Sequence, residues 1–146
     1  KVCDLSAKGR QQRAVRDHAD VARTLLAAFS PGLPARLFEP ARALTMIDRR
    51  RVEICRALIR DPALLLLDEP SAGMTPDETA ELMTDLLAVK ARRPALTVVI
   101  IEHDMAVIER VSDRCVVLDY GRKLAEGSYA EVAADPVVRR AYLGED

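Results

Sequence analysis

Two apolar runs that end in charged side chains constrain the fold of this chain more than any other feature. Residues 63–67 are followed at once by two carboxylates, and residues 96–101 by two carboxylates that flank a histidine. Neither run alternates with polar residues, and each is only five or six residues long. Runs of this kind are typical of strands that are buried on both faces of a parallel sheet. Since stretches of helical period separate the runs, the sequence predicts an α/β fold.

The remaining pattern predicts the other elements. Helices are expected over residues 17–30, 47–59, 76–89 and 105–111, strands over 115–118 and 123–125, and short helices from Ser128 and from Asp135. Asp17 is the expected N-cap of the first helix, and Thr75 with Glu78 is placed to form a capping box before Pro76. In the second helix Val52, Cys55 and Ile59 are expected to face the core and the arginines to face solvent. The alternation of strands and helices assigns the strand over 115–118 to the same parallel sheet.

Composition and charge exclude several classes of protein. With 49% hydrophobic and 31% charged residues, the chain is neither a disordered tail nor a membrane span. A net charge of −1 and 3% aromatic residues predict no nucleic-acid partner. Residues 1–60 carry 13 basic and 6 acidic side chains and residues 61–146 carry 9 and 17, an asymmetry that indicates docking surfaces. Three widely spaced cysteines favour a reducing, cytosolic location over a disulfide framework.

The carboxylates after the first run are candidate catalytic residues. Asp68 and Glu69 stand at the carboxyl end of a predicted parallel strand, the edge at which α/β proteins bind ligands. Asp68 is expected to hold Mg²⁺ and Glu69 to direct an attacking water. After the second run, His103 is placed to bond a γ-phosphate or to hold that water. The alternatives are a surface acidic pair that caps a helix and a purely structural histidine.

These residues lie in motifs that resemble those of ATP-binding-cassette (ABC) ATPases, in the same order and spacing. The similar segments are the Walker B strand with its catalytic glutamate (64–70), the D-loop (71–76), the switch-histidine segment (101–104) and the helix after the signature motif (50–58). The tail, residues 116–127 and 141–146, resembles the ATPases of branched-chain amino acid importers, and urea and short-amide importers have similar tails. The resemblance covers about residues 40–146, the C-terminal part of such an ATPase.

The resemblance implies that the full-length parent hydrolyses ATP with Mg²⁺ and drives import of branched-chain amino acids or related small solutes. Asp68 would place Mg²⁺, Glu69 would polarise the water, and His103 would sense the γ-phosphate. The implied partners are transmembrane permease subunits and a second ATPase subunit, identical or different. The implied location is the cytoplasmic side of the cell membrane, as a peripheral subunit.

The signature region departs from the family pattern. Thr45, Arg49, Ala72 and Gly73 are the residues that the resemblance places against the nucleotide of the second ATPase subunit. Thr45 keeps a hydroxyl, and Arg49 stands in place of a glutamine, where a cation can still contact phosphate. Ile47 stands in place of a glycine, and its side chain is expected to obstruct the approach of that nucleotide.

The phosphate-binding pattern G-x-x-x-x-G-K-[ST] does not occur in residues 1–146. In the family this loop would precede Lys1, so a longer parent is expected, and the chain alone is expected neither to bind ATP tightly nor to hydrolyse it. One alternative is a non-catalytic docking or regulatory module on a transporter or ATPase partner. Another, a cassette ATPase of DNA repair or translation, is disfavoured by the importer-like tail.

The expected organisation is a helical subdomain followed by the C-terminal half of a P-loop NTPase core with a parallel sheet. The expected segments are a polar loop or frayed end (1–16), the helical subdomain with its degenerate signature region (17–60), the C-terminal part of the ATPase core (61–126) and a helical tail (127–146).

Overall fold

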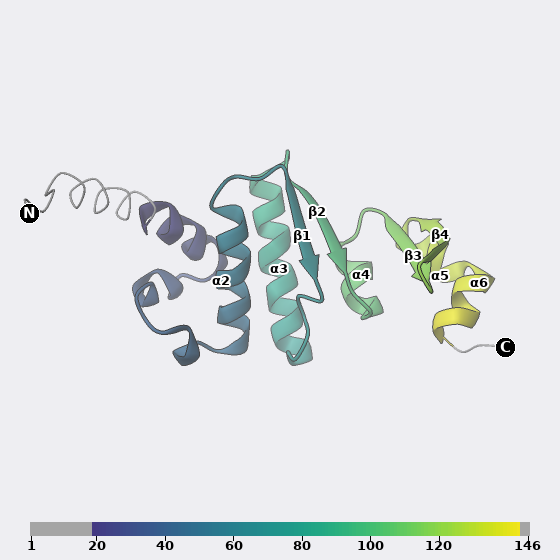
Figure 1. The fold of residues 1–146 in the computed structure, drawn as a ribbon, viewed down its shortest axis with the longest axis horizontal. Helices are drawn as coiled ribbons and strands as arrows, with labels where there is room; N and C mark the ends of the chain where they lie inside the picture. Colours follow the sequence, from purple (N-terminus) through teal and green to yellow (C-terminus); the bar gives the residue numbers. More distant parts are fainter. Residues whose placement is uncertain (1–18, 144–146) are drawn as a thin grey trace, which may run out of the picture. The chain divides into compact units, whose positions relative to one another are not determined.

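The computed structural model describes residues 19–143, which fall into two compact units (Figure 1). The first unit ends at Ile100 and the second begins at Ile101. The polar loop expected over residues 1–16 and the N-cap expected at Asp17 lie outside the described residues.

The first unit opens with helical segments. A helix over residues 19–29 ends at Ser30, as predicted, and buries one face of its last turns. The buried side chains on that face are Leu25, Leu26 and Phe29. Two short 3-10 helices follow, η1 (Leu33–Arg36) and η2 (Ala41–Ala43).

Helix α2 (Met46–Leu58) follows η2. Thr45 is its N-cap, because the Thr45 side-chain oxygen accepts a hydrogen bond from the backbone N–H of Asp48 at 3.3 Å. Of the three side chains predicted to face the core, Cys55 is buried, whereas Val52 and Ile59 are half-buried. The expectation that all arginines of this helix face solvent is wrong, because Arg51 is only 4% exposed. A guanidinium is tolerated there because carboxylates surround it, as described below.

Strands β1 (Leu64–Asp68) and β2 (Thr97–Ile101) pair with each other, and Figure 1 shows both arrows running in the same direction. Between them the chain forms α3 (Pro76–Arg92). The predicted capping box of Thr75 and Glu78 is confirmed at the start of α3. Two parallel strands joined by a helix confirm the α/β fold class.

Only one face of this sheet is buried in the described part of the chain. Leu65 is 3% exposed, whereas its neighbours Leu64 and Leu66 are 50% and 68% exposed. Val99 and Ile101 of β2 are exposed as well. The expectation that both strands are buried on both faces is therefore wrong. Successive side chains of a strand point to opposite faces, so this alternation means that a packed layer covers one face and solvent reaches the other.

Over residues 101–143 the second unit contains a β-hairpin and four short helices. The helices are α4 (Met105–Val111), α5 (Tyr129–Ala134), α6 (Pro136–Val138) and the π-helical η3 (Arg139–Leu143). Strands β3 (Cys115–Asp119) and β4 (Arg122–Gly127) pair antiparallel. Tyr120 and Gly121 form the turn, with φ angles of 45° and 76°, and positive φ at both positions is typical of a tight hairpin turn.

The hairpin corrects the expected topology. The sequence assigns the strand over 115–118 to the parallel sheet, but β3 pairs with β4 in a separate two-stranded sheet. The physical reason is that a two-residue turn brings β4 beside β3 at a small cost in loop-closure entropy. In residues 19–143 no helix is both long and apolar enough to cross a membrane.

Candidate functional site

One end of the first unit collects most of the candidate residues. Figure 1 shows that α2 and α3 begin, and β1 ends, at the same end of the unit. This arrangement places Thr45, the pair Asp68 and Glu69, and residues 71–75 at one edge. It is the carboxyl edge of the parallel strands, where α/β proteins bind ligands.

Glu69 has an unusual backbone conformation. Asp68 is the last residue of β1 and Glu69 follows it, and both residues are exposed. The φ angle of Glu69 is 42°, in the left-handed region that residues other than glycine rarely adopt. Its carbonyl accepts a hydrogen bond from the Ala72 N–H at 3.1 Å, so the chain turns sharply after the strand. Strained backbone of this kind is often found at functional sites.

The turn after β1 lies against the start of α2. Gly73 has a φ of 78°, a conformation that favours glycine. A β-carbon at Gly73 would lie 3.9 Å from Cε of Met46, the first residue of α2. Thr45, Ala72 and Gly73 are all exposed. The structure therefore brings three of the residues that were expected to meet a second subunit's nucleotide to one exposed edge.

Ile47 does not lie where its substitution for glycine suggested. Its side chain is only 7% exposed and belongs to the core of the first unit. The bulky side chain on the exposed side of the first turn of α2 is Met46, which is 42% exposed. The Ile47 side chain, which was expected to obstruct the approach of the nucleotide, is therefore directed into the core instead.

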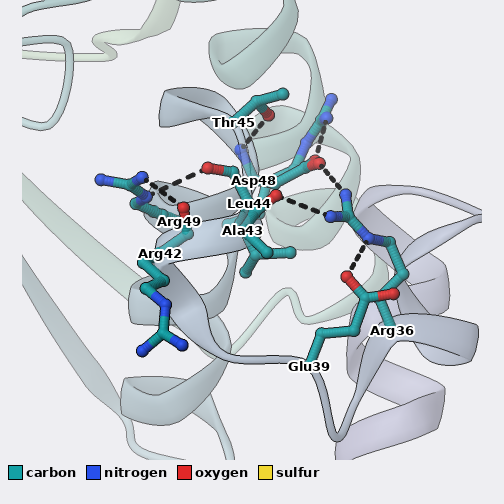
Figure 2. A network of polar contacts seen from close by, with 9 residues as sticks. Arg36, Glu39, Arg42, Ala43, Leu44, Thr45, Asp48 and Arg49 are labelled. Carbon is teal, nitrogen blue, oxygen red and sulfur yellow. Dashed lines mark hydrogen bonds and ion pairs between the residues drawn. The ribbon is translucent and has the colours of Figure 1, made fainter.

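The guanidinium of Arg49 donates hydrogen bonds to two backbone carbonyls. Its Nε donates to the carbonyl of Leu44 and its Nη2 to the carbonyl of Arg42, both at 3.1 Å (Figure 2). Its guanidinium thus supports the segment that leads into α2.

Arg51 is a buried ionic residue that sequence reasoning missed. Its guanidinium donates to Asp85 at 2.7 and 2.8 Å, to Glu81 at 2.5 Å and to Asp48 at 3.2 Å. Asp48 lies on α2 and the other two carboxylates on α3, so Arg51 links the two helices. Charge spacing within α2 does not reveal these partners, because Glu81 and Asp85 are 30 and 34 residues away along the chain.

Burial and pairing act in opposite directions on the pKa values of this cluster. Burial lowers the pKa of Arg51, but its hydrogen bonds to Glu81 and Asp85 outweigh this and leave its pKa above the ordinary value. Burial also raises the pKa of the Asp85 carboxyl, although the hydrogen bond from Arg51 lowers it. The cluster is therefore stable only while the guanidinium is present to compensate the buried carboxylate.

The polar residues after β2 have separate roles in the second unit. Asp104 caps α4 by accepting a hydrogen bond from the Ala106 N–H at 2.9 Å. The side chain of His103 is 74% exposed, and its Nδ1 lies 3.9 Å from Oε2 of Glu102, whose side chain is fully buried. A common site for His103 and the carboxylates after β1 stays a prediction.

The residues fit a weakly held divalent cation. No group of three or more His, Cys, Asp or Glu residues that could hold a metal occurs within residues 19–143. Mg²⁺ usually binds one or two carboxylates and completes its shell with water and substrate phosphates. The exposed carboxylate of Asp68 at the end of β1 suits that mode of binding.

Known proteins are similar to this chain over most of its length. Residues 122–146 match the family model of the branched-chain amino acid ATP-binding cassette transporter. The high-affinity branched-chain amino acid transport ATP-binding protein LivG of Salmonella typhimurium is 40% identical over 134 residues, 92% of this chain and 51% of LivG. Its counterpart BraF of Pseudomonas aeruginosa is 41% identical over 105 residues, 72% of this chain and 41% of BraF.

A solved structure of an ATP-binding cassette is similar to this chain in fold. The ADP conformation of MJ1267, an ATP-binding cassette of an ABC transporter, matches with a TM-score of 0.77 and 29% identity over 88% of this chain and 51% of MJ1267. The chain is similar in sequence and in fold to the C-terminal part of ABC ATPases. The resemblance noted from the motifs is thereby confirmed. The chain spans about half the length of the curated ABC relatives named above.

Proposed function

We propose that this chain supplies the catalytic carboxylate of an ABC importer subunit that hydrolyses ATP to drive uptake of branched-chain amino acids or related small solutes. The observation that carries the proposal is the pair Asp68 and Glu69, exposed at the carboxyl end of β1 with Glu69 in a left-handed conformation. The class of solute is supported by LivG and BraF, which are high-affinity branched-chain amino acid transport ATP-binding proteins.

In the proposed reaction each of three side chains has a separate role. The Glu69 carboxylate accepts a hydrogen bond from a water and orients it for in-line attack on the γ-phosphorus. Asp68 would hold Mg²⁺, which neutralises charge that develops on the transferred phosphoryl group. The exposed imidazole of His103 donates a hydrogen bond to a γ-phosphate oxygen. Residues 1–146 contain no phosphate-binding loop, so the proposal requires residues outside this sequence to hold the triphosphate.

The proposal includes two kinds of partner. Thr45, Ala72 and Gly73, exposed at one edge, meet the nucleotide held by a second ATPase subunit. Transmembrane permease subunits couple hydrolysis to solute movement and hold the ATPase at the cytoplasmic side of the membrane.

Uptake by intact cells tests the function. A Glu69→Gln variant keeps the size of the side chain but removes the charge, and Glu109→Gln, on the exposed side of α4, is the matched control. Uptake of labelled leucine, isoleucine and valine is expected to fall to background in Glu69→Gln cells and to persist in the control. If uptake of the labelled solute is inhibited by excess unlabelled urea or acetamide but not by unlabelled leucine, the transported solutes are small amides rather than branched-chain amino acids. Unchanged uptake of every solute in Glu69→Gln cells would favour the non-catalytic docking module.

A further inference from the structure

Two arginines hold the backbone segment that leads into α2. Three consecutive carbonyl oxygens each accept a hydrogen bond from a guanidinium, as Figure 2 shows. The bonds are Arg49 Nη2 to Arg42 at 3.1 Å, Arg36 Nη2 to Ala43 at 2.9 Å and Arg49 Nε to Leu44 at 3.1 Å. Donors that carry charge make stronger hydrogen bonds than neutral donors, and the planar fork of arginine fixes their direction. We call residues 42–44 with Arg36 and Arg49 the arginine clamp.

The clamp is tied to the N-cap of α2 through Asp48. Arg36 Nη1 lies 3.4 Å from one Asp48 oxygen, and Arg51 Nη1 lies 3.2 Å from the other. The backbone N–H of Asp48 in turn donates to the Thr45 hydroxyl oxygen. Arg36 is itself held by Glu39, at 2.9 Å from its Nε. The position of Thr45 is thus set by contacts from η1, from the segment before α2 and from α2 itself.

The same contacts connect α2 to α3. Asp48 shares Arg51 with Glu81 and Asp85, so the start of α2 is fixed relative to α3. Helix α3 begins just after Ala72 and Gly73. The network therefore holds the two exposed segments of the edge in one arrangement.

We propose that Arg36 and Arg49 are positioning residues that aim the Thr45 hydroxyl at the nucleotide of the second ATPase subunit. The inference rests on the proposed function. The oxygen of Thr45 accepts from the Asp48 N–H, and its O–H remains able to donate to a phosphate oxygen. Arg49 acts through Thr45, because its Nε and Nη2 donate to the carbonyls of Leu44 and Arg42 and so hold the residues that precede Thr45.

The clamp fixes the path of the backbone segment that leads into α2. The family pattern has a glycine where Ile47 stands here, and Ile47 is buried. The path of residues 42–45 is fixed by contacts from Arg36 of η1 and from Arg49 of α2. Misplacing a contact group by about 1 Å can slow a reaction by about 10²-fold. Loss of the clamp is therefore expected to slow turnover.

The test combines hydrogen exchange with kinetics in the native ATPase assembly, purified through a tag at the C-terminal end of this chain. The variants are Arg36→Gln, Arg49→Gln, their double variant and Arg49→Lys. Arg56→Gln, an exposed arginine on the same helix, is the matched control. Thr45→Val keeps the shape of the side chain but removes the hydroxyl, and with it both the proposed nucleotide contact and the N-cap hydrogen bond from the Asp48 N–H. Hydrogen exchange is therefore measured on this variant together with its rate.

Support requires two results together. Amide exchange over residues 45–49 rises in the double variant, and kcat falls at least about tenfold with little change in KM for ATP, as in Thr45→Val. Arg49→Lys, which keeps the charge but not the fork, recovers part of kcat, and Arg56→Gln behaves as the parent.

Two other results overturn the proposal and differ in meaning. Unchanged exchange in the double variant shows that the arginines do not hold the segment, whatever the rate. Raised exchange with a normal rate in both the double variant and Thr45→Val shows that the clamp is only structural and that the proposed contact of Thr45 is absent. A loss of activity in Glu69→Gln would then still support the proposed function.

Discussion

At the scale of single residues, Arg51 shows how far tertiary partners override a surface pattern. It lies within a run of three arginines that reads as a solvated helix face. Its side chain is nevertheless 5% exposed and surrounded by three carboxylates, with Asp85 16% exposed. Removing one partner of a buried ion pair leaves an uncompensated charge in the core.

Replacement of Arg51 by methionine is expected to destabilise the chain by about 3–5 kcal/mol at neutral pH. The expected cause is the unpaired carboxylate of Asp85 rather than lost volume, because methionine fills most of the space. Urea unfolding of the variant and of an Arg56→Met control on the exposed side of α2 measures the difference. Equal free energies of unfolding for the two variants would show that Arg51 does not stabilise the fold through its carboxylate partners.

The same variant has a predicted pH dependence. Burial already raises the pKa of Asp85, and loss of Arg51 removes the hydrogen bond and charge that lower it. A carboxyl with a raised folded-state pKa binds its proton more strongly in the folded state, so stability falls as pH rises through that pKa. As pH is lowered from neutral toward the ordinary pKa of aspartate, the free energy of unfolding of the Arg51→Met variant should therefore rise toward that of the parent. A deficit that stays constant with pH would exclude Asp85 as its source.

Glu69 allows a prediction in which stability and activity separate. Its φ of 42° strains a side-chain-bearing residue but suits glycine. Glu69→Gly is expected to leave the free energy of unfolding unchanged or to raise it by up to about 1 kcal/mol, while ATP hydrolysis is lost. Thermal unfolding and an ATPase assay on the same preparation measure both. A clear loss of stability would mean that the Glu69 side chain holds the turn together.

At the scale of elements, β1 gives a matched pair of leucines on opposite faces. Leu65 is 3% exposed and Leu66 is 68% exposed. In residues 1–146, Leu65→Ala is expected to cost about 2–5 kcal/mol of unfolding free energy. Leu66→Ala is expected to change it by no more than about 0.5 kcal/mol. Chemical unfolding compares the two, and equal costs would mean that another layer covers the face that carries Leu66.

The positions of most helices and strands could be predicted from local signals in the sequence. The capping box at Thr75, the apolar run of β1 and the stop at Ser30 each depend on neighbouring residues, and the structure has these elements where they were predicted. Helix α4 lies over the predicted residues as well. These features could be predicted because their physical causes lie within a few residues.

Features that depend on distant partners could not be predicted in the same way. The burial of Arg51 depends on carboxylates of α3, and the use of Arg49 depends on the path of residues 42–44. Whether β3 joins the parallel sheet or pairs with β4 depends on competition between partners, which the apolar run of β3 does not encode. Within the candidate site, the positions of Asp68 and Glu69 could be predicted because they follow a strand directly, whereas the clamp could not.

At the scale of the whole molecule, the chain of 146 residues spans about half the length of its curated relatives. In the proposed function Glu69 orients the attacking water, and residues outside this sequence hold the triphosphate. The chain by itself is therefore expected to show no ATP hydrolysis above background, and the native assembly is expected to hydrolyse ATP.

The measurement that tests this account most directly is the rate of ATP hydrolysis by the native assembly, purified through a tag at the C-terminal end of this chain. The comparison is between the parent, Glu69→Gln and the exposed control Glu109→Gln. The account predicts Mg²⁺-dependent hydrolysis in the parent and the control, and a fall of at least about 10²-fold in Glu69→Gln. Hydrolysis that persists in Glu69→Gln, or an assembly that never hydrolyses ATP, would contradict it.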